Sequence, residues 1–254
     1  MAETVQLFAT CLLDTLYPEV GESVIRILNR CGVTVEFPPG QTCCGQPAYN
    51  AGMRRQARKL AEHTIRVFEP TQGWVVVPSG SCAAMIRYSY LELFSGDEDW
   101  LPRARKLAER TVELTEYLVD IRRTSNLKAQ FPGKITYHSS CHLLRELHVD
   151  RQPRLLMQAV EGAELVELEG TQECCGFGGV FSVEHPEISA AMLERKIGNI
   201  LASGADVVIS CDAGCITHIN GGLQRRGLPP SAVHIAQLLD GLGAPLAQGG
   251  SGND

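Results

Sequence analysis

The chain has 254 residues, of which 44% are hydrophobic and 20% charged, and its formal net charge is -6 at pH 7. This composition is typical of a globular protein with a sizeable core, and the acidic balance argues against nucleic acid or an anionic membrane surface as the main partner. The first residues lack a basic region and no apolar run is long enough to span a bilayer. We therefore expect a cytoplasmic protein with no signal peptide and no transmembrane segment.

Ten cysteines stand out, because this number is high for a cytosolic enzyme and low for a disulfide scaffold of this length. Thiols in the cytosol stay reduced, so metal or redox chemistry is favoured over disulfides. Eight of the ten form two matching sets, with an offset of 130 residues for the first member and 133 for the last. The sets are Cys11, Cys43, Cys44 and Cys82 in the first half, and Cys141, Cys174, Cys175 and Cys215 in the second.

Predicted elements repeat in the same order around both sets. In the first half they are a strand at 5–10, a helix around 24–28, a strand at 33–37, a helix at about 54–69, a strand at 74–77 and a long amphipathic helix at about 102–119. In the second half they are a strand at 135–138, a helix around 155–159, a strand at 165–168, a helix at about 187–202 and a strand at 207–209. Strands that alternate with helices predict parallel sheets with helices on their faces.

Turn-forming residues between 124 and 133 mark a boundary between the halves. We therefore expect two tandem homologous α/β domains related by a pseudo-twofold duplication, the first at 1–130 and the second at 131–240. The Gly- and Ser-rich stretch at 241–254 is expected to be a disordered tail.

Each matched cysteine lies just after a predicted strand, where ligands gather in a parallel α/β sheet. Four convergent thiolates are the usual ligands of an iron–sulfur cluster, so one [4Fe–4S] cluster per half is predicted. Adjacent cysteines such as Cys43 and Cys44 seldom bind one tetrahedral zinc, which favours a C-x(2–4)-C spacing. Zinc and simple burial of the thiols remain alternatives, and burial is the better reading for Cys31, which has no counterpart in the second half.

Glycines accompany both cysteine pairs, at 45 in the first half and at 176, 178 and 179 in the second. Glycine allows the backbone to approach an inorganic core, and its N–H group can donate a hydrogen bond to cluster sulfur. These Cys-Cys-Gly segments resemble the CCG cysteine-rich domain of heterodisulfide reductase and related Fe–S oxidoreductases. The segments 43–48 (CCGQPA), 78–82 (PSGSC), 137–142 (YHSSCH) and 174–179 (CCGFGG) resemble the lactate utilization protein A family more closely.

The resemblance implies an iron–sulfur electron-transfer subunit of a multiprotein system that oxidises L-lactate to pyruvate. It implies as partners the other subunits of that system, including a ferredoxin-like Fe–S protein. It does not imply that this chain alone binds lactate, because no residue pattern here recognises a 2-hydroxy acid.

The chain departs from the full CCG pattern, in which a C-x-x-C motif supplies five cysteines per site and the reductase holds noncubane clusters. The earlier position of that motif is Ser79 in the first half and Asp212 in the second. Four thiolates per site fit a [4Fe–4S] cluster and argue against the noncubane form. Cys211 is a candidate fifth ligand in the second half only.

No nucleotide-binding or nucleophile motif accompanies the cysteines, so no flavin or nicotinamide site is predicted. Beside Cys141, His138 is a candidate proton donor or hydrogen-bond partner, whereas a structural role is preferred for His142 and His218. Three functions stay open at this point: an electron relay, a heterodisulfide or thiol–disulfide reductase acting at a cluster, and a zinc-stabilised assembly scaffold.

Overall fold

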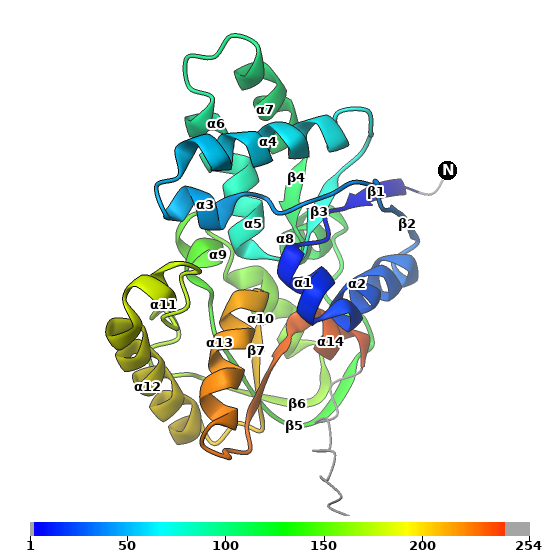
Figure 1. Cartoon of the computed structure of the whole chain (residues 1–254). Helices are drawn as coiled ribbons and strands as arrows, with labels where there is room; N and C mark the ends of the chain where they lie inside the picture. Colours follow the sequence, from blue (N-terminus) through cyan, green and yellow to red (C-terminus); the bar gives the residue numbers. More distant parts are fainter. Residues whose placement is uncertain (1–2, 242–254) are drawn as a thin grey trace, which may run out of the picture.

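The computed structural model describes residues 3–241 and contains two four-stranded parallel sheets, one in each half (Figure 1). The first sheet consists of β1 (Glu3–Leu7), β2 (Val33–Glu36), β3 (Val75–Val77) and β4 (Thr111–Glu113). The second consists of β5 (Gln130–Tyr137), β6 (Glu161–Val166), β7 (Val207–Ser210) and β8 (Ser231–His234). The strand orders, β2-β1-β3-β4 and β6-β5-β7-β8, are equivalent. The predicted tandem α/β duplication is therefore confirmed.

Helices connect consecutive strands in both halves. The first half contains α1 (Cys11–Leu16), α2 (Pro18–Arg30), α3 (Gln46–Asn50), α4 (Arg54–Phe68), α5 (Gly80–Ala84), the π-helix η1 (Met85–Ser89), α6 (Tyr90–Leu93), α7 (Trp100–Glu109), α8 (Leu114–Glu116) and the π-helix η2 (Tyr117–Ile121). The second contains α9 (Cys141–Arg145), α10 (Arg151–Gln158), α11 (Phe181–Glu184), α12 (Pro186–Ser203), α13 (Ala213–Gln224) and α14 (Ile235–Asp240).

The inner strands β3 and β7 are short, largely apolar and enclosed on both faces. All three valines of β3 and all four residues of β7 are buried, as expected for parallel strands covered by helices. Their β-branched side chains also favour the extended backbone. Because β3 and β7 lead directly into α5 and α13, these strands set the positions of the residues at the start of both helices.

The predicted helix at 102–119 is wrong. Helix α7 ends at Glu109, and the next residues form the edge strand β4, whose Val112 pairs with Val76 of β3. The Thr111 hydroxyl donates a hydrogen bond of 2.8 Å to the Leu107 carbonyl, which satisfies a carbonyl at the helix end. Pairing with β3 and complete burial of the strand outweigh the continuing helical pattern of the sequence.

Glu113 and His234 end the edge strands β4 and β8. Both are buried polar groups that cap the following helix. Glu113 accepts hydrogen bonds from Thr115 N and Glu116 N. The His234 ring accepts one of 3.2 Å from Ala236 N. Equivalent positions thus use a carboxyl group and an imidazole for the same structural task.

The halves exchange packing partners reciprocally. Helix α14 of the second half packs on α2 of the first, where Arg26 Nε lies 2.6 Å from Asp240 Oδ2 (Figure 1). In the equivalent arrangement, α8 and η2 of the first half pack on α10, and Gln152 donates a hydrogen bond of 2.6 Å to Asp120. Each half therefore covers a helix of the other.

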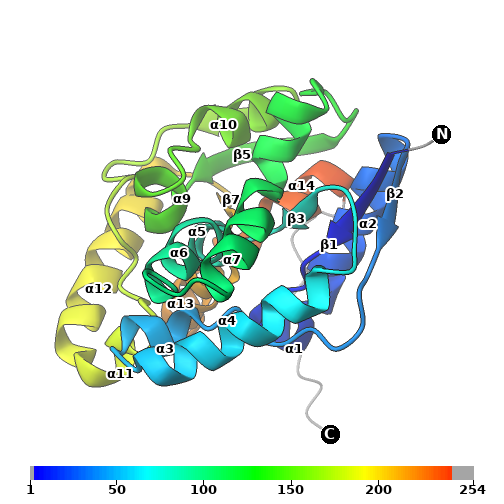
Figure 2. The ribbon, with the colours of Figure 1, turned by 90° about the horizontal axis from the view of Figure 1, so that it is seen from above.

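The centre of the molecule joins the halves as well. Helices α5 and α9 lie side by side (Figure 2), and a side-chain carbon added at Gly80 would come within 2.6 Å of Leu143 Cβ. One hydrophobic cluster runs through both halves, from Val5 and Val76 to Ile135 and Leu238. The domain boundary at 130/131 stays a prediction, and all but residue 241 of the predicted tail lies outside the described residues.

Candidate metal centre

All eight matched cysteines line one cavity of about 150 Å³ at the carboxyl ends of the inner strands. We call Cys11, Cys43, Cys44 and Cys82 the first cysteine site, and Cys141, Cys174, Cys175 and Cys215 the second cysteine site. The rule that loops meet at the carboxyl ends of parallel strands predicted each set separately. The structure goes further, because both sets face the same cavity.

In the first cysteine site, Cys11 begins α1, Cys43 and Cys44 precede α3, and Cys82 is the third residue of α5. The sulfur atoms of Cys44 and Cys82 lie 3.4 Å apart, and Cys43 hydrogen-bonds with both Cys11 and Cys44. The four thiols therefore form a continuous chain of contacts.

The second cysteine site has the same construction. Cys141 begins α9 and Cys215 is the third residue of α13, while Cys174 hydrogen-bonds with both Cys141 and Cys175. Cys175 in turn contacts Cys215. In both sites the first two cysteines are half-buried and the last two are buried. Equivalent cysteines therefore also match in their exposure to solvent.

Hydrogen bonds between the thiols place negative charge at equivalent positions. Bonds from Cys11 and Cys44 lower the pKa of Cys43, and bonds from Cys141 and Cys175 lower that of Cys174. The same bonds, together with burial, raise the pKa of the thiols that donate them. The thiolate is the form that binds metals, and each site already favours one.

Glycine allows the cysteine pairs to turn into the cavity. Gly45 and Gly176 have φ angles of 91° and 94°, in the left-handed region that favours glycine. Their N–H groups donate hydrogen bonds of 3.4 and 3.3 Å to the sulfur atoms of Cys43 and Cys174. A side-chain carbon at Gly176 would lie 2.6 Å from the Ser189 carbonyl oxygen, so the backbone approaches α12 closely.

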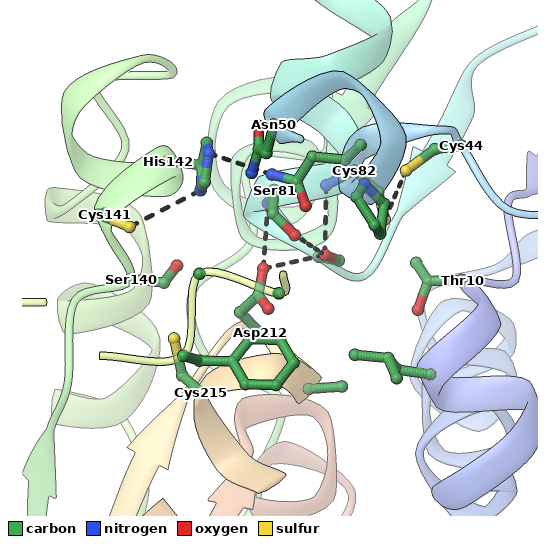
Figure 3. A pocket seen from close by; sticks show the side chains of 18 of the residues that line it. Thr10, Cys44, Asn50, Ser81, Cys82, Ser140, Cys141, His142, Asp212 and Cys215 are labelled. Atoms are coloured by element: carbon green, nitrogen blue, oxygen red, sulfur yellow. Dashed lines mark hydrogen bonds between the residues drawn. The ribbon is translucent and has the colours of Figure 1, made fainter. Parts of the chain in front are cut away.

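Two hydroxyl groups at equivalent positions line the cavity without a hydrogen-bond partner among the described residues. Thr10 and Ser140 directly precede Cys11 and Cys141, and both are buried (Figure 3). They occupy the N-cap positions of α1 and α9, but neither side chain makes a capping hydrogen bond. Buried hydroxyls normally have partners. A group in the cavity that accepts hydrogen bonds, such as the sulfide of an iron–sulfur cluster, would supply one for each. The donor set and these hydroxyls fit such a cluster.

The two departures from the CCG pattern are hydrogen-bonded to each other. The Asp212 carboxylate accepts bonds of 3.0 Å from Ser79 Oγ and 3.1 Å from Ser81 N across the interface, and one of 3.1 Å from Gly214 N (Figure 3). Ser79 and Asp212 are the N-cap residues of α5 and α13, the helices that carry Cys82 and Cys215. One carboxylate therefore fixes the relative position of both cysteine sites.

His142 joins the halves at the cavity wall. Its Nε2 lies 3.1 Å from Gln46 Nε2, and its Nδ1 lies 3.7 Å from Cys141 Sγ (Figure 3). His142 therefore has a defined place in the cavity, although a structural role was preferred for it from the sequence. His218, also assigned a structural role, packs against Phe177 and lies 3.3 Å from Ser189 Oγ.

His138 and Lys196 are buried beside the second cysteine site. A ring nitrogen of His138 and the sulfur atoms of Cys175 and Cys215 all lie within 4.8 Å of one another. Desolvation and the nearby Lys196 lower the pKa of His138 to about 3, which keeps the ring neutral. Lys196 donates a hydrogen bond of 2.5 Å to the Gly170 carbonyl, and burial lowers its pKa. Sequence reasoning missed Lys196, which lies within an ordinary helical pattern.

Cys211 does not line the cavity. Its thiol is completely buried and contacts the Tyr137 hydroxyl, and burial raises its pKa. A ligand role for Cys211 would require its side chain to turn away from Tyr137. Cys31 lies half-buried at the end of α2.

Comparison with known proteins assigns the family. The model of the CCG cysteine-rich domain matches twice, at residues 5–87 and 135–220. Lactate utilization protein A 2 of Bacillus cereus (strain Q1) is 45% identical over 92% of this chain and 97% of its own length. Lactate utilization protein A of an Exiguobacterium species is 45% identical over 93% and 96%. This chain belongs to the lactate utilization protein A family.

Both copies of the family's domain contain one complete cysteine site. Among solved structures, glutamate racemase from Campylobacter jejuni aligns with 93% of this chain at 13% identity and a TM-score of 0.35, a likeness too weak to support an argument. In the described part of this chain, no helix combines the length and apolar character that crossing a bilayer requires.

Proposed function

We propose that this protein is an iron–sulfur electron-transfer subunit of a multiprotein system that oxidises L-lactate to pyruvate. The observation that carries the proposal is the pair of equivalent cysteine sites lining one cavity. The name of the relatives, lactate utilization protein A, supports the metabolic assignment.

In this proposal each cysteine site binds one cluster, held by Cys11, Cys43, Cys44 and Cys82 or by Cys141, Cys174, Cys175 and Cys215. A [4Fe–4S] cluster would supply one-electron transfer. The protein supplies thiolates, the N–H groups of Gly45 and Gly176, and the hydroxyls of Thr10 and Ser140 as hydrogen-bond donors. Such donors stabilise the added negative charge of a reduced centre and thereby tune its potential.

Partner subunits, including a ferredoxin-like Fe–S protein, complete the proposed system. Because the sequence contains no nucleotide-binding motif, this chain would relay electrons released elsewhere. The half-buried Cys11, Cys43, Cys141 and Cys174 are the members of the two sites nearest to solvent, where electrons would enter or leave.

The test is reduction by lactate. The brown protein, purified anaerobically and mixed with its partner subunits, should lose its broad visible absorption when L-lactate is added, and not when D-lactate replaces it. The isolated chain with lactate should remain oxidised. Lack of bleaching in the complete system, with cluster present, would contradict the electron-relay assignment.

The shared cavity favours a second candidate, a thiol–disulfide or heterodisulfide reductase. Gln46, Asn50 and His142 offer polar groups along a wall that also carries cysteines of both sites. Turnover of a disulfide by the isolated chain with a chemical reductant would support this candidate. A zinc-stabilised scaffold is the third candidate, and metal analysis distinguishes it from both.

A further inference from the structure

His138 is a completely buried polar side chain whose two ring nitrogens both lack a hydrogen-bond partner among the described residues. Leaving such a group unpaired is unfavourable, because its hydrogen bonds to water are lost without replacement. The backbone N–H of His138 does have a partner, since it donates a hydrogen bond of 2.9 Å to the Ile209 carbonyl. The unpaired ring therefore indicates a missing partner for the side chain.

The His138 ring is not among the residues that line the cavity, and it approaches the second cysteine site from its buried side. One of its nitrogens and the sulfur atoms of Cys175 and Cys215 lie within 4.8 Å of one another, and all three residues are buried. They come from three separate segments, namely the end of β5, the loop before α11 and the first turn of α13. Such convergence of one nitrogen and two sulfur donors is the arrangement expected of a metal site.

Within residues 3–241, the first cysteine site has no such donor. The residue three positions before Cys11 is Phe8, just as His138 precedes Cys141 by three positions. Phe8 is buried and stacks on Phe68 with ring centroids 5.7 Å apart. An apolar ring thus fills in the first half the position that an imidazole occupies in the second.

We propose that His138 is a fifth protein ligand of the second cysteine site and binds a metal of that site through a ring nitrogen. The inference rests on the proposed function and makes the second centre a mixed sulfur and nitrogen site. The neutral imidazole is a common metal ligand.

Pulsed electron paramagnetic resonance of the reduced protein tests the inference. Wild-type protein grown with natural-abundance or ¹⁵N-labelled histidine should show the hyperfine coupling of a directly bound nitrogen, and that coupling should change with the isotope. The coupling should belong to the signal that Cys175→Ser removes and Cys44→Ser retains. This comparison needs no change at His138, so it does not depend on how a variant folds.

The variant His138→Phe, which copies the first half, should lose the coupling. The control His142→Phe removes the other histidine close to Cys141 and should retain the coupling. Iron and sulfide without a directly bound nitrogen, or a coupling that survives in His138→Phe, would overturn the inference and leave the proposed function intact. A protein without iron and sulfide would remove both.

Discussion

The two cysteine sites share their thiols but differ in the side chains behind them. The second site has the buried imidazole of His138 and the buried amine of Lys196, whereas Phe8 and Thr64 occupy the corresponding positions of the first. Gly45 closely approaches Ala57 of α4, and Gly176 closely approaches Ser189 of α12, so these two helices align with an offset of 132 residues. The same offset aligns Lys196 with Thr64. Equivalent sulfur ligands therefore lie in unlike electrostatic environments.

In the proposed electron relay, the two halves are therefore not interchangeable. A buried positive charge, such as that of Lys196, stabilises a centre that gains an electron. Among the described residues, such a charge occurs at the second site alone. Electrons that enter at the first site would therefore move to the second.

Replacing one cysteine of a site should have the largest effect, because only the half that contains it should lose its metal. Cys44→Ser and Cys175→Ser each delete the buried central thiol of one site. Each variant should retain about half of the wild-type iron and sulfide and lose one of two paramagnetic signals. Metal and sulfide analysis of anaerobic protein measures this. Loss of all iron in both variants would show that the sites bind metal as a single unit.

Replacement of Asp212 should lower the stability of the protein, because this carboxylate links the two halves beside the cysteine sites. Asp212→Ala leaves Ser79 Oγ, Ser81 N and Gly214 N without their acceptor, at a cost of roughly 2–5 kcal/mol in the free energy of unfolding. Asp212→Asn retains an acceptor oxygen and should lose less. Chemical denaturation of both variants measures the difference, and equal stability of Asp212→Ala and wild type would contradict the assigned role.

The outer-strand caps should respond to pH in opposite directions. Burial raises the pKa of Glu113 to about 7, so its contribution to stability is complete below about pH 4.5 and is lost as pH rises through 7. Burial lowers the pKa of His234 to about 4, so its contribution is present above about pH 6.5 and is lost as pH falls through 4. Each effect is on the order of 3 kcal/mol.

Thermal unfolding between pH 4.5 and 7 checks both signs. Glu113→Gln should make stability rise more steeply with pH, because the loss contributed by the carboxyl group is removed. His234→Gln should make stability fall more steeply as pH rises, because the gain contributed by the imidazole is removed. Equal pH profiles for the two variants would show that the equivalent caps do not titrate as assigned.

Neutralisation of Lys196 should have the smallest effect, a lower midpoint potential of the second centre. Lys196→Met keeps the length of the side chain and removes its charge. Loss of a buried positive charge beside the centre destabilises its reduced form, so its midpoint potential should fall by tens of millivolts, as an order of magnitude. Redox titration should show a lower potential for the second centre only. The control Thr64→Val, at the corresponding position of the first half, should shift neither.

Much of the fold and the grouping of the cysteines at the strand ends could be predicted because the relevant signals are local. A run such as Val75–Val77 followed by Cys82 indicates a buried strand that delivers a thiol to its carboxyl end. The three-residue strand β4 was missed because a short edge strand after Glu109 continues the helical pattern. Its pairing with β3 depends on tertiary contact, which outweighs local propensity.

Features that depend on contact between the halves were beyond the sequence. Ser79 and Asp212 were noted only as missing cysteines, and their mutual hydrogen bond spans 133 residues. The shared cavity was not predicted either, since each set of cysteines was considered within its own half. The buried charge of Lys196 could have been noticed only by aligning it with Thr64 across the repeat.

Iron and acid-labile sulfide quantitation of the anaerobically purified chain, with electron paramagnetic resonance before and after reduction, tests the central claim most directly. Two [4Fe–4S] clusters require about eight irons and eight sulfides per chain, with two signals after reduction. A colourless protein that contains stoichiometric zinc and no sulfide would contradict the claim that the cysteine sites hold clusters.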